Sequence, residues 1–206
     1  MRPNTRVRCK ALPCSDVKHE CYLVPDINLK TETISMVMIS EAAPTNPKDY
    51  SYAKGDSLFQ QTTVQAFNDA GAKVLSVRDL LGLGVYLTTA VKCGKTGYGL
   101  QASTVKESSL LLEQELALFP NVQAFMLMGD VAIKALNSIA QRAGEGRVIP
   151  AASTYKIRGQ EYFFRGKRAF PSYLQAGPSS FVEIIKRKAI AQDIAAALKL
   201  VGGLAD

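Results

Sequence analysis

Four cysteines form a group of side chains that could bind a metal. Cys9, Cys14 and Cys21 lie within the first tenth of the chain, and Cys93 follows a predicted strand. Thiolates are ligands for zinc and for iron–sulfur clusters, and four is the usual number of ligands for either. Disulfides are disfavoured in the cytoplasm, where we expect this chain, so ligation is the preferred interpretation. The spacing C-x4-C-x6-C is not that of a zinc ribbon, and four unrelated thiols are the alternative.

A second group combines positive charge with aromatic rings. The chain of 206 residues carries a net charge of +7 and has a pI near 9.2, which favours an anionic partner. Between positions 155 and 170, aromatic and basic residues interleave, as they do in sites that attract phosphates and stack bases. A basic surface hairpin whose rings belong to the core is the alternative. The residues are Lys156, Arg158, Arg165, Lys167 and Arg168, with Tyr155, Tyr162, Phe163, Phe164 and Phe170.

The bulk composition predicts one globular domain over residues 1–206, with the cysteine-containing segment 1–30 packed on it. Hydrophobic residues make up 47% of the chain and charged residues 21%, which is typical of a folded protein. No apolar run reaches the length of a membrane span, and the N-terminus is polar and basic. We therefore expect a soluble cytoplasmic monomer with no membrane partner.

Hydrophobic runs and helix breakers predict alternating strands and helices. The predicted strands are 34–39, 84–91 and 122–128, with a short pair at 149–157 and 161–165 turned by Gly159. The predicted helices are 58–70, 104–118, 131–142 and 181–200, the second of them opened by a capping box from Thr104 to Glu107. This alternation predicts an α/β fold, a three-layer α/β/α sandwich with a mainly parallel central sheet.

Three segments fall where such folds bind ligands, outside the carboxyl ends of the strands. They are 40–44 (Ser-Glu-Ala-Ala-Pro), 86–93 (Tyr-Leu-Thr-Thr-Ala-Val-Lys-Cys) and 170–174 (Phe-Pro-Ser-Tyr-Leu). In this order they resemble the three signature motifs of the uracil-DNA glycosylase superfamily, and are closest to its iron–sulfur-type branch. Residues 126–132 also resemble the family's apolar strand followed by Leu-Gly-x-x-Ala. The resemblance runs from about Ile34 to the last helix.

The resemblance implies roles for residues of the first two motifs. Glu41 matches the acidic residue that positions or activates water, although the family's opening glycine is absent and the proline comes one place late. Ala42 and Phe59 would contact the extruded base, the phenyl ring by stacking. Thr89 stands where the family has an asparagine that contacts the base edge, so the selectivity for uracil is expected to differ.

The third motif lacks the histidine that stabilises the leaving base in active members, and Phe170 stands in its place. Losing such a donor typically costs about 100- to 1000-fold in rate. The resemblance implies that Pro171 and Ser172 keep the grip on a DNA phosphate, and Arg168 is expected to add positive charge there.

In the iron–sulfur branch, the cysteine that corresponds to Cys93 is a cluster ligand. The branch takes two ligands from the N-terminal segment and one from a helix, but here the helix position is Leu111. With three N-terminal cysteines, Cys9, Cys14, Cys21 and Cys93 make up four ligands for a 4Fe–4S cluster. Zinc, or no metal, is the alternative.

The sequence therefore predicts a DNA glycosylase-like protein that hydrolyses the bond between a deaminated or damaged base, uracil or related, and its sugar during base excision repair. A catalytically silent nucleic-acid-binding member of the same superfamily is the first alternative. An unrelated α/β enzyme acting on a small anionic substrate is the second.

Overall fold

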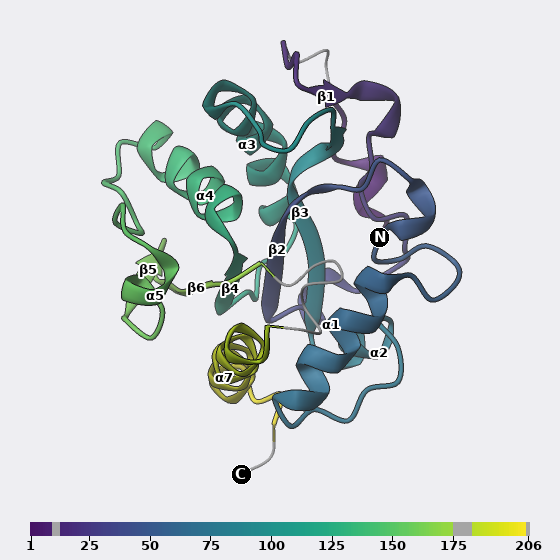
Figure 1. The fold of residues 1–206 in the computed structure, drawn as a ribbon, viewed down its shortest axis with the longest axis vertical. Coiled ribbons are helices and arrows are strands. Elements are labelled where there is room, and N and C mark those ends of the chain that lie inside the picture. Colours follow the sequence, from purple (N-terminus) through teal and green to yellow (C-terminus); the bar gives the residue numbers. More distant parts are fainter. Residues whose placement is uncertain (10–12, 175–182, 205–206) are drawn as a thin grey trace.

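The computed structural model describes residues 1–9, 13–174 and 183–204, which form a mixed α/β fold around one six-stranded sheet (Figure 1). The strands are β1 (Val17–Lys18), β2 (Met36–Ala43), β3 (Val85–Lys95), β4 (Ala124–Met128), β5 (Tyr162–Phe164) and β6 (Lys167–Ser172). The α-helices are α1 (Leu58–Asp69), α2 (Asp79–Gly82), α3 (Ala102–Leu116), α4 (Asp130–Arg142), α5 (Thr154–Ile157) and α7 (Ile184–Leu200). Short 3-10 turns lie at Pro3–Thr5, His19–Cys21, Thr31–Thr33 and Pro47–Asp49.

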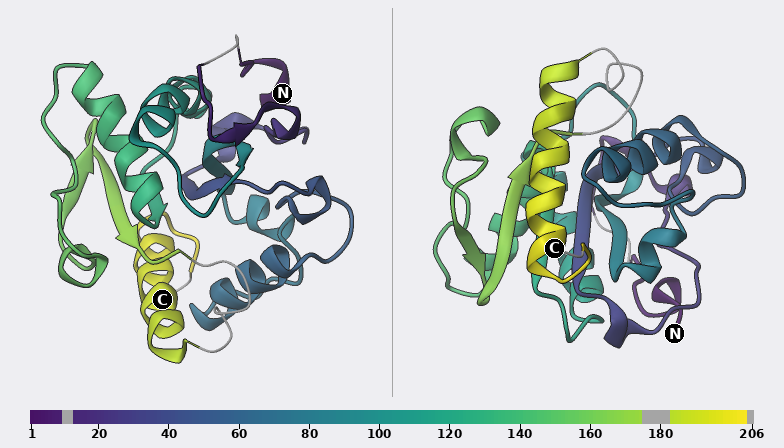
Figure 2. Two further views of the ribbon diagram at one scale, coloured as in Figure 1. Left: turned by 45° about the horizontal axis from the view of Figure 1, so that its top comes forward. Right: turned by 90° about the horizontal axis from the view of Figure 1, so that it is seen from below.

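The sheet is mixed, with the strand order β1-β3-β2-β4-β6-β5. β2 pairs in parallel with β3 and β4, and β4 pairs in parallel with β6. The two edge strands, β1 and β5, pair antiparallel with their neighbours. Figure 2 shows the β5–β6 hairpin at one end of the molecule and the N-terminal segment at the other.

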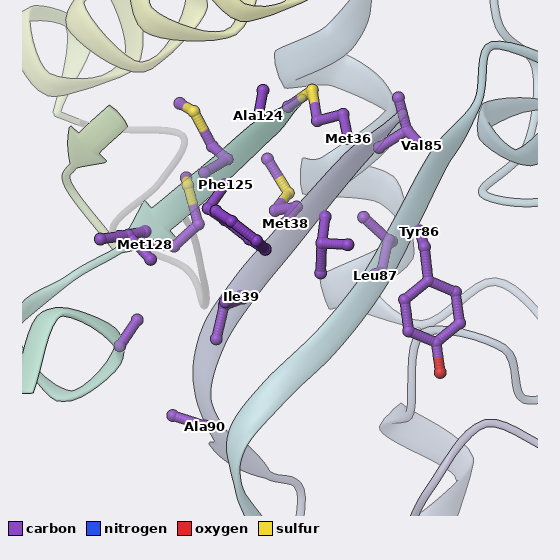
Figure 3. Packing of buried hydrophobic residues seen from close by; sticks show 14 of the residues in the cluster. Met36, Met38, Ile39, Val85, Tyr86, Leu87, Ala90, Ala124, Phe125 and Met128 are labelled. Atoms are coloured by element: carbon purple, nitrogen blue, oxygen red, sulfur yellow. The ribbon is translucent and has the colours of Figure 1, made fainter. Parts of the chain in front are cut away.

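The core lies around β2, β3 and β4, whose residues are buried along almost the whole of each strand. Figure 3 shows methionine, aliphatic and aromatic side chains of these strands, among them Met38, Leu87 and Phe125, in one cluster. Continuous apolar runs of this kind are typical of strands that are covered on both faces.

The helices pack in two pairs, α3 with α4 and α1 with α7, which lie on different sides of the strands (Figure 1). A bidentate ion pair joins α1 to α7. Arg187 contacts Asp69 at 2.5 Å from Nε to Oδ2 and at 3.0 Å from Nη2 to Oδ1. Within the described part of the chain, no helix is both long enough and apolar enough to cross a membrane.

Two segments that we expected to be loops are strand. β2 continues through residues 40–43 because Ser40 and Ala42 keep their pairing with Thr89 and Val91 of β3. In the same way, residues 170–172 of the third motif lie within β6, where Phe170 pairs with Met126 of β4. The carboxyl ends of β2 and β3 were predicted too early, whereas the predicted end of β4 at residue 128 is confirmed.

The predicted capping box at the start of α3 is wrong. The helix begins at Ala102, and the hydroxyl of Thr104 donates to Asp16 rather than to its own helix. Asp16 also accepts the backbone N–H of Gln101 at 2.6 Å. The cap of this helix thus comes from the N-terminal segment.

The predicted strand pair around Gly159 is half right. The strand expected at 161–165 is β5, but residues 154–157 form the short helix α5, and the hairpin joins β5 to β6. Its turn lies at Arg165 and Gly166, whose φ angles of 50° and 74° are both positive. Two consecutive residues of this kind match the right-handed twist of a hairpin. Of the last predicted helix, residues 181 and 182 lie outside the described residues.

Candidate functional site

A pocket of about 350 Å³ opens where β2 and β3 approach their carboxyl ends. This edge is where α/β folds bind ligands, and the volume falls within the usual range of about 300–1,000 Å³. Four predicted site residues, from three separate segments, line it together: Glu41, Ala42, Phe59 and Thr89. The other described lining residues are Ser40, Ala43, Pro44, Thr45, Asp49, Tyr50, Ser51, Lys95 and Leu174.

Glu41 supplies a carboxylate at the end of β2. Its Oε1 accepts a hydrogen bond of 2.9 Å from Nζ of Lys95, a residue that the sequence analysis did not identify. The Glu41 side chain is 21% exposed and that of Lys95 is 35% exposed, so the pair is reached by water. Among the described residues Oε2 has no hydrogen-bond partner. The carboxylate can therefore orient a water molecule while the ammonium fixes its other oxygen.

A close backbone approach shapes the wall next to Glu41. The register of β2 against β3 shifts between Ala42 and Ala43, so that Ala43 lies opposite Gly94. A Cβ atom on Gly94 would lie 2.9 Å from Cγ2 of Thr45 and 3.0 Å from its Cα. Bulges of this kind re-aim side chains at the ends of strands, and here only glycine leaves room for the chain to turn into the pocket wall.

Phe59 reaches the pocket from the first turn of α1. Ser57 and Gln60 form a capping box at the start of this helix, which fixes where the turn begins. The Gln60 amide also donates to the carbonyl oxygens of Ser51 and Ala53 at 3.1 and 2.9 Å. One buried glutamine thus holds both the helix start and the preceding loop. The spacing Ser57-x-x-Gln60 carried this signal in the sequence, but it was not identified.

The backbone of Thr89 contacts a buried network of charged and polar groups. Nζ of Lys92 donates to the carbonyl oxygen of Thr89 at 2.5 Å and to Oγ1 of Thr88 at 2.7 Å, and it forms an ion pair with Glu115 of α3. Both charged side chains are fully buried. Burial lowers the pKa of Lys92, and Glu115 acts in the opposite direction.

Glu115 also accepts hydrogen bonds from two other residues of β3. The hydroxyls of Tyr86 and Thr88 donate to its two oxygens at 2.7 Å each. Since side chains alternate along a strand, Tyr86, Thr88 and Lys92 point to the face of β3 that carries Glu115. Thr89 belongs to the opposite face.

Two hydroxyls at the pocket have no hydrogen-bond partner among the described residues: those of Tyr50 and Thr89. Tyr50 was not identified from the sequence, because it lies in a polar segment with no periodic pattern. Its pKa is raised well above the ordinary value, first by burial and then by Glu115. The phenol therefore keeps its proton.

Phe170, Pro171 and Ser172 of the third motif are not among the residues that line this pocket. Phe170 is half-buried in β6, with the Arg168 guanidinium 4.8 Å from the centre of its ring. Pro171 is buried, and Ser172 is completely buried with its hydroxyl donating to Asp193 of α7 at 2.7 Å. In this arrangement the Ser172 hydroxyl is not exposed to a phosphate. Leu174, two residues further on, is the residue of this segment that lines the pocket.

Asp193 is held from a second side by Arg158, at 2.9 Å from Nη2 to Oδ1. Burial raises the pKa of this carboxyl, and the contacts with Ser172 and Arg158 act in the opposite direction. In the described structure, Ser172 thus acts as a link between β6 and α7.

The cysteine-containing segment is fastened to β3 on both sides of Cys93. Val17 pairs with Lys95, and the backbone N–H of Leu23 donates to the carbonyl oxygen of Lys92 at 2.7 Å. This pairing brings the predicted ligands near one another. Burial raises the pKa of Cys93 to about 11, and the neighbouring thiols of Cys9, Cys14 and Cys21 add to the shift.

The donor chemistry fits a thiolate-bound metal or cluster, because the thiols of Cys9, Cys14 and Cys21 are neighbours of Cys93. Among the described residues, however, no three histidine, cysteine or acidic side chains are already arranged to hold a metal ion. Cys21 instead donates to the carbonyl oxygen of Thr45, at 3.2 Å. The single histidine, His19, lies in this segment, with Nε2 2.9 Å from the carbonyl oxygen of Cys14.

A search among models of known protein families found none that matches this chain, and no curated protein matches it either.

Proposed function

We propose that this chain is a DNA glycosylase-like protein that hydrolyses the N-glycosidic bond of a deaminated or damaged base. The observation that carries the proposal is the convergence of Glu41, Ala42, Phe59 and Thr89 on one pocket. A carboxylate, an aromatic ring and a polar strand residue are what removal of an extruded base requires. They supply charge stabilisation or water orientation, a stacking platform and a contact for the base edge.

The fold supports the same proposal. Three of the five strand pairings are parallel, and helices lie on different sides of the strands. We take this arrangement as the three-layer α/β/α sandwich of the uracil-DNA glycosylase superfamily. The positive charge of the chain favours DNA as the partner.

In this proposal Glu41 orients the attacking water, or stabilises the positive charge that develops on the sugar as the bond breaks. Lys95 holds the carboxylate in place at 2.9 Å. Phe59 stacks on the base. The negative charge that develops on the leaving base has no imidazole beside it, because among the described residues no histidine lines the pocket. Slow excision is therefore expected.

We also propose that Cys9, Cys14, Cys21 and Cys93 hold a 4Fe–4S cluster or zinc. Such a group, once bound, would supply a structural cross-link between the N-terminal segment and β3. Metal analysis and visible absorbance of protein purified without oxygen test this part. A colourless preparation without iron or zinc would contradict it.

The activity is tested on single-stranded oligonucleotides that contain uracil, hypoxanthine or xanthine, with alkaline cleavage of the abasic product as the readout. Wild-type protein should release at least one base, and Glu41→Gln should abolish release while oligonucleotide binding persists. Glu32→Gln, which changes an exposed carboxylate before the amino end of β2, is the matched control and should behave as wild type.

The absence of a histidine from the described pocket lining favours a second candidate, a catalytically silent nucleic-acid-binding member of the same superfamily. Salt-dependent binding of all three oligonucleotides with no abasic product would support it over the enzyme. If no oligonucleotide bound at all, an enzyme for a small anionic substrate would be favoured instead.

A further inference from the structure

The pocket contains an amine that a substrate can reach. Among the described residues that line it, Lys95 is the only lysine, and it lies at the carboxyl end of β3. Its side chain is 35% exposed, whereas that of Lys92 in the same strand is fully buried in its pair with Glu115. A lysine amine is a nucleophile towards carbonyl groups, with which it forms an imine. Lys95 is therefore the amine that can react with a molecule in the pocket.

Two acceptors hold the nitrogen of Lys95 in place. Nζ donates to Oε1 of Glu41 and to the carbonyl oxygen of Tyr98, at 2.9 Å in each case. An ammonium has three N–H groups, and the third has no partner among the described residues. The nitrogen is thus fixed from two sides and open on a third, and such positioning favours attack on a bound substrate.

The contact with Glu41 also places a base beside the nucleophile. A nucleophile and a base within hydrogen-bond reach of each other are the usual arrangement in covalent catalysis. Oε2 of Glu41 has no partner among the described residues, so it is available to accept a proton. Together the two side chains can attack a carbonyl carbon and remove a proton from the carbon next to it.

Removal of a base from DNA generates a substrate of this kind. The abasic deoxyribose is in equilibrium with an open form in which C1′ is an aldehyde, and C2′ next to it carries hydrogen atoms. In the proposed function this sugar is produced in the pocket that Lys95 and Glu41 line. An aldehyde and an amine would therefore meet directly after excision.

We propose that Lys95 is the nucleophile of a second activity, cleavage of the DNA strand at an abasic site. The amine, after losing its extra proton to water, bonds through its lone pair to C1′, and the aldehyde oxygen leaves as water. The inference rests on the proposed function in taking DNA as the substrate, but it starts from an abasic site however that site was made.

Strand cleavage then follows by elimination. Glu41 takes a proton from C2′, and the electrons of that bond form a double bond between C2′ and C3′. The bond between C3′ and its oxygen breaks, and the phosphate leaves as the 5′ end of the downstream fragment. Water finally hydrolyses the imine and frees Lys95. No atom changes oxidation state through an outside reagent, so the step requires no oxidant or reductant.

The first test is reductive trapping on an oligonucleotide whose abasic site was made beforehand by another glycosylase. Cyanoborohydride reduces an imine to a stable amine, so a trapped protein stays bound to DNA in a denaturing gel. Wild-type protein should form this complex. Lys95→Arg keeps a positive charge beside Glu41 but forms no imine, so the complex should be lost. Lys48→Arg is the matched control and should trap as wild type does, because Lys48 is exposed and is not among the residues that line the pocket.

Peptide mass spectrometry of the trapped wild-type protein should place the sugar remnant on Lys95. This measurement does not depend on whether Lys95→Arg folds. Glu41→Gln separates the two steps, because imine formation does not use the carboxylate and elimination does. This variant should still be trapped, but it should cleave the strand about 100-fold more slowly than wild type.

Three results would overturn the inference: no trapped complex with wild-type protein, an undiminished complex with Lys95→Arg, or a sugar remnant on a different lysine. Failure of the proposed function gives a different result. Wild-type protein would then release no base from the uracil, hypoxanthine or xanthine oligonucleotides, although it is trapped on the preformed abasic site. Base release without trapping would remove this inference and leave the proposed function standing.

Discussion

The buried ion pair beneath the pocket gives the sharpest prediction about stability. Lys92 and Glu115 are both fully buried, and Glu115 also accepts hydrogen bonds from Tyr86 and Thr88. Replacing Lys92 with Met leaves a carboxylate buried without its counter-ion, and replacing Glu115 with Leu leaves a buried ammonium. Removing one member of such a pair costs about 3–5 kcal/mol.

For a domain of this size, 1 kcal/mol corresponds to about 2–4 °C, so each single variant should melt about 6–20 °C below wild type. The double variant Lys92→Met/Glu115→Leu removes both charges and should recover part of this loss. The recovery is incomplete because the buried hydroxyls of Tyr86 and Thr88 lose their acceptor. Urea unfolding followed by circular dichroism measures all four proteins, and the double-mutant cycle isolates the coupling.

Lys134→Met is the control, because it makes the same change in an exposed ion pair. Lys134 pairs with Asp130 one helical turn away, with side chains 57% and 71% exposed. The unfolding free energy should change by no more than about 0.5 kcal/mol. If Lys92→Met lost less than about 1 kcal/mol, or if the double variant were as unstable as the sum of the singles, the reasoning about the buried pair would be refuted.

Three further predictions concern the links around the pocket. Gly94→Ala should destabilise the fold by about 1–3 kcal/mol, because its new Cβ would lie within 3.0 Å of the Thr45 backbone; unchanged urea unfolding would contradict the close approach. Ser172→Ala should lower the unfolding free energy by about 1.5–3 kcal/mol, because it removes the hydrogen bond to the buried Asp193. If the unfolding free energy were unchanged and DNA binding were weaker, a direct contact between Ser172 and a phosphate would be favoured instead. The ion pair between α1 and α7 lowers the pKa of Asp69 through its hydrogen bond with Arg187, and Asp69→Asn removes this pair. The stabilising effect of the pair, about 0.5–1 kcal/mol, should be present at neutral pH and be lost as the pH falls through the lowered pKa. The difference in unfolding free energy between wild type and variant should therefore shrink as the pH is lowered, and a difference that does not shrink in acid would refute the assignment.

The centres of the main strands could be predicted from the sequence because burial on both faces needs continuous apolar runs. The carboxyl end of β2 could not, because Ser40 and Ala42 stay in the ladder through pairing with β3, about 50 positions away. The start of α3 was missed for the same reason. Its cap is Asp16, which is 88 positions from Thr104, and a local pattern cannot contain it.

The pocket was predictable where a residue could be matched to a motif, as for Glu41 and Thr89. Tyr50 and Lys95 carried no such signal, since their importance depends on contacts between segments. Ser172 is the opposite case. Its motif indicated a surface role, whereas the described structure turns its hydroxyl inward to a carboxylate of α7.

Side chains along β3 point to alternate faces of the strand, and this alternation also affects whether β3 pairs with β2 in the correct register during folding. One face of the strand carries the side chains that donate to Glu115, and the other carries Thr89. A slip of one residue against β2 would exchange the two faces. Lys92 would then lie on the face that carries Thr89, away from the buried carboxylate, and Glu115 would lose its three donors. The same few residues that build the site therefore discriminate against mispaired sheets, and we expect substitutions among them to favour misfolding and aggregation more than their distance from the surface suggests.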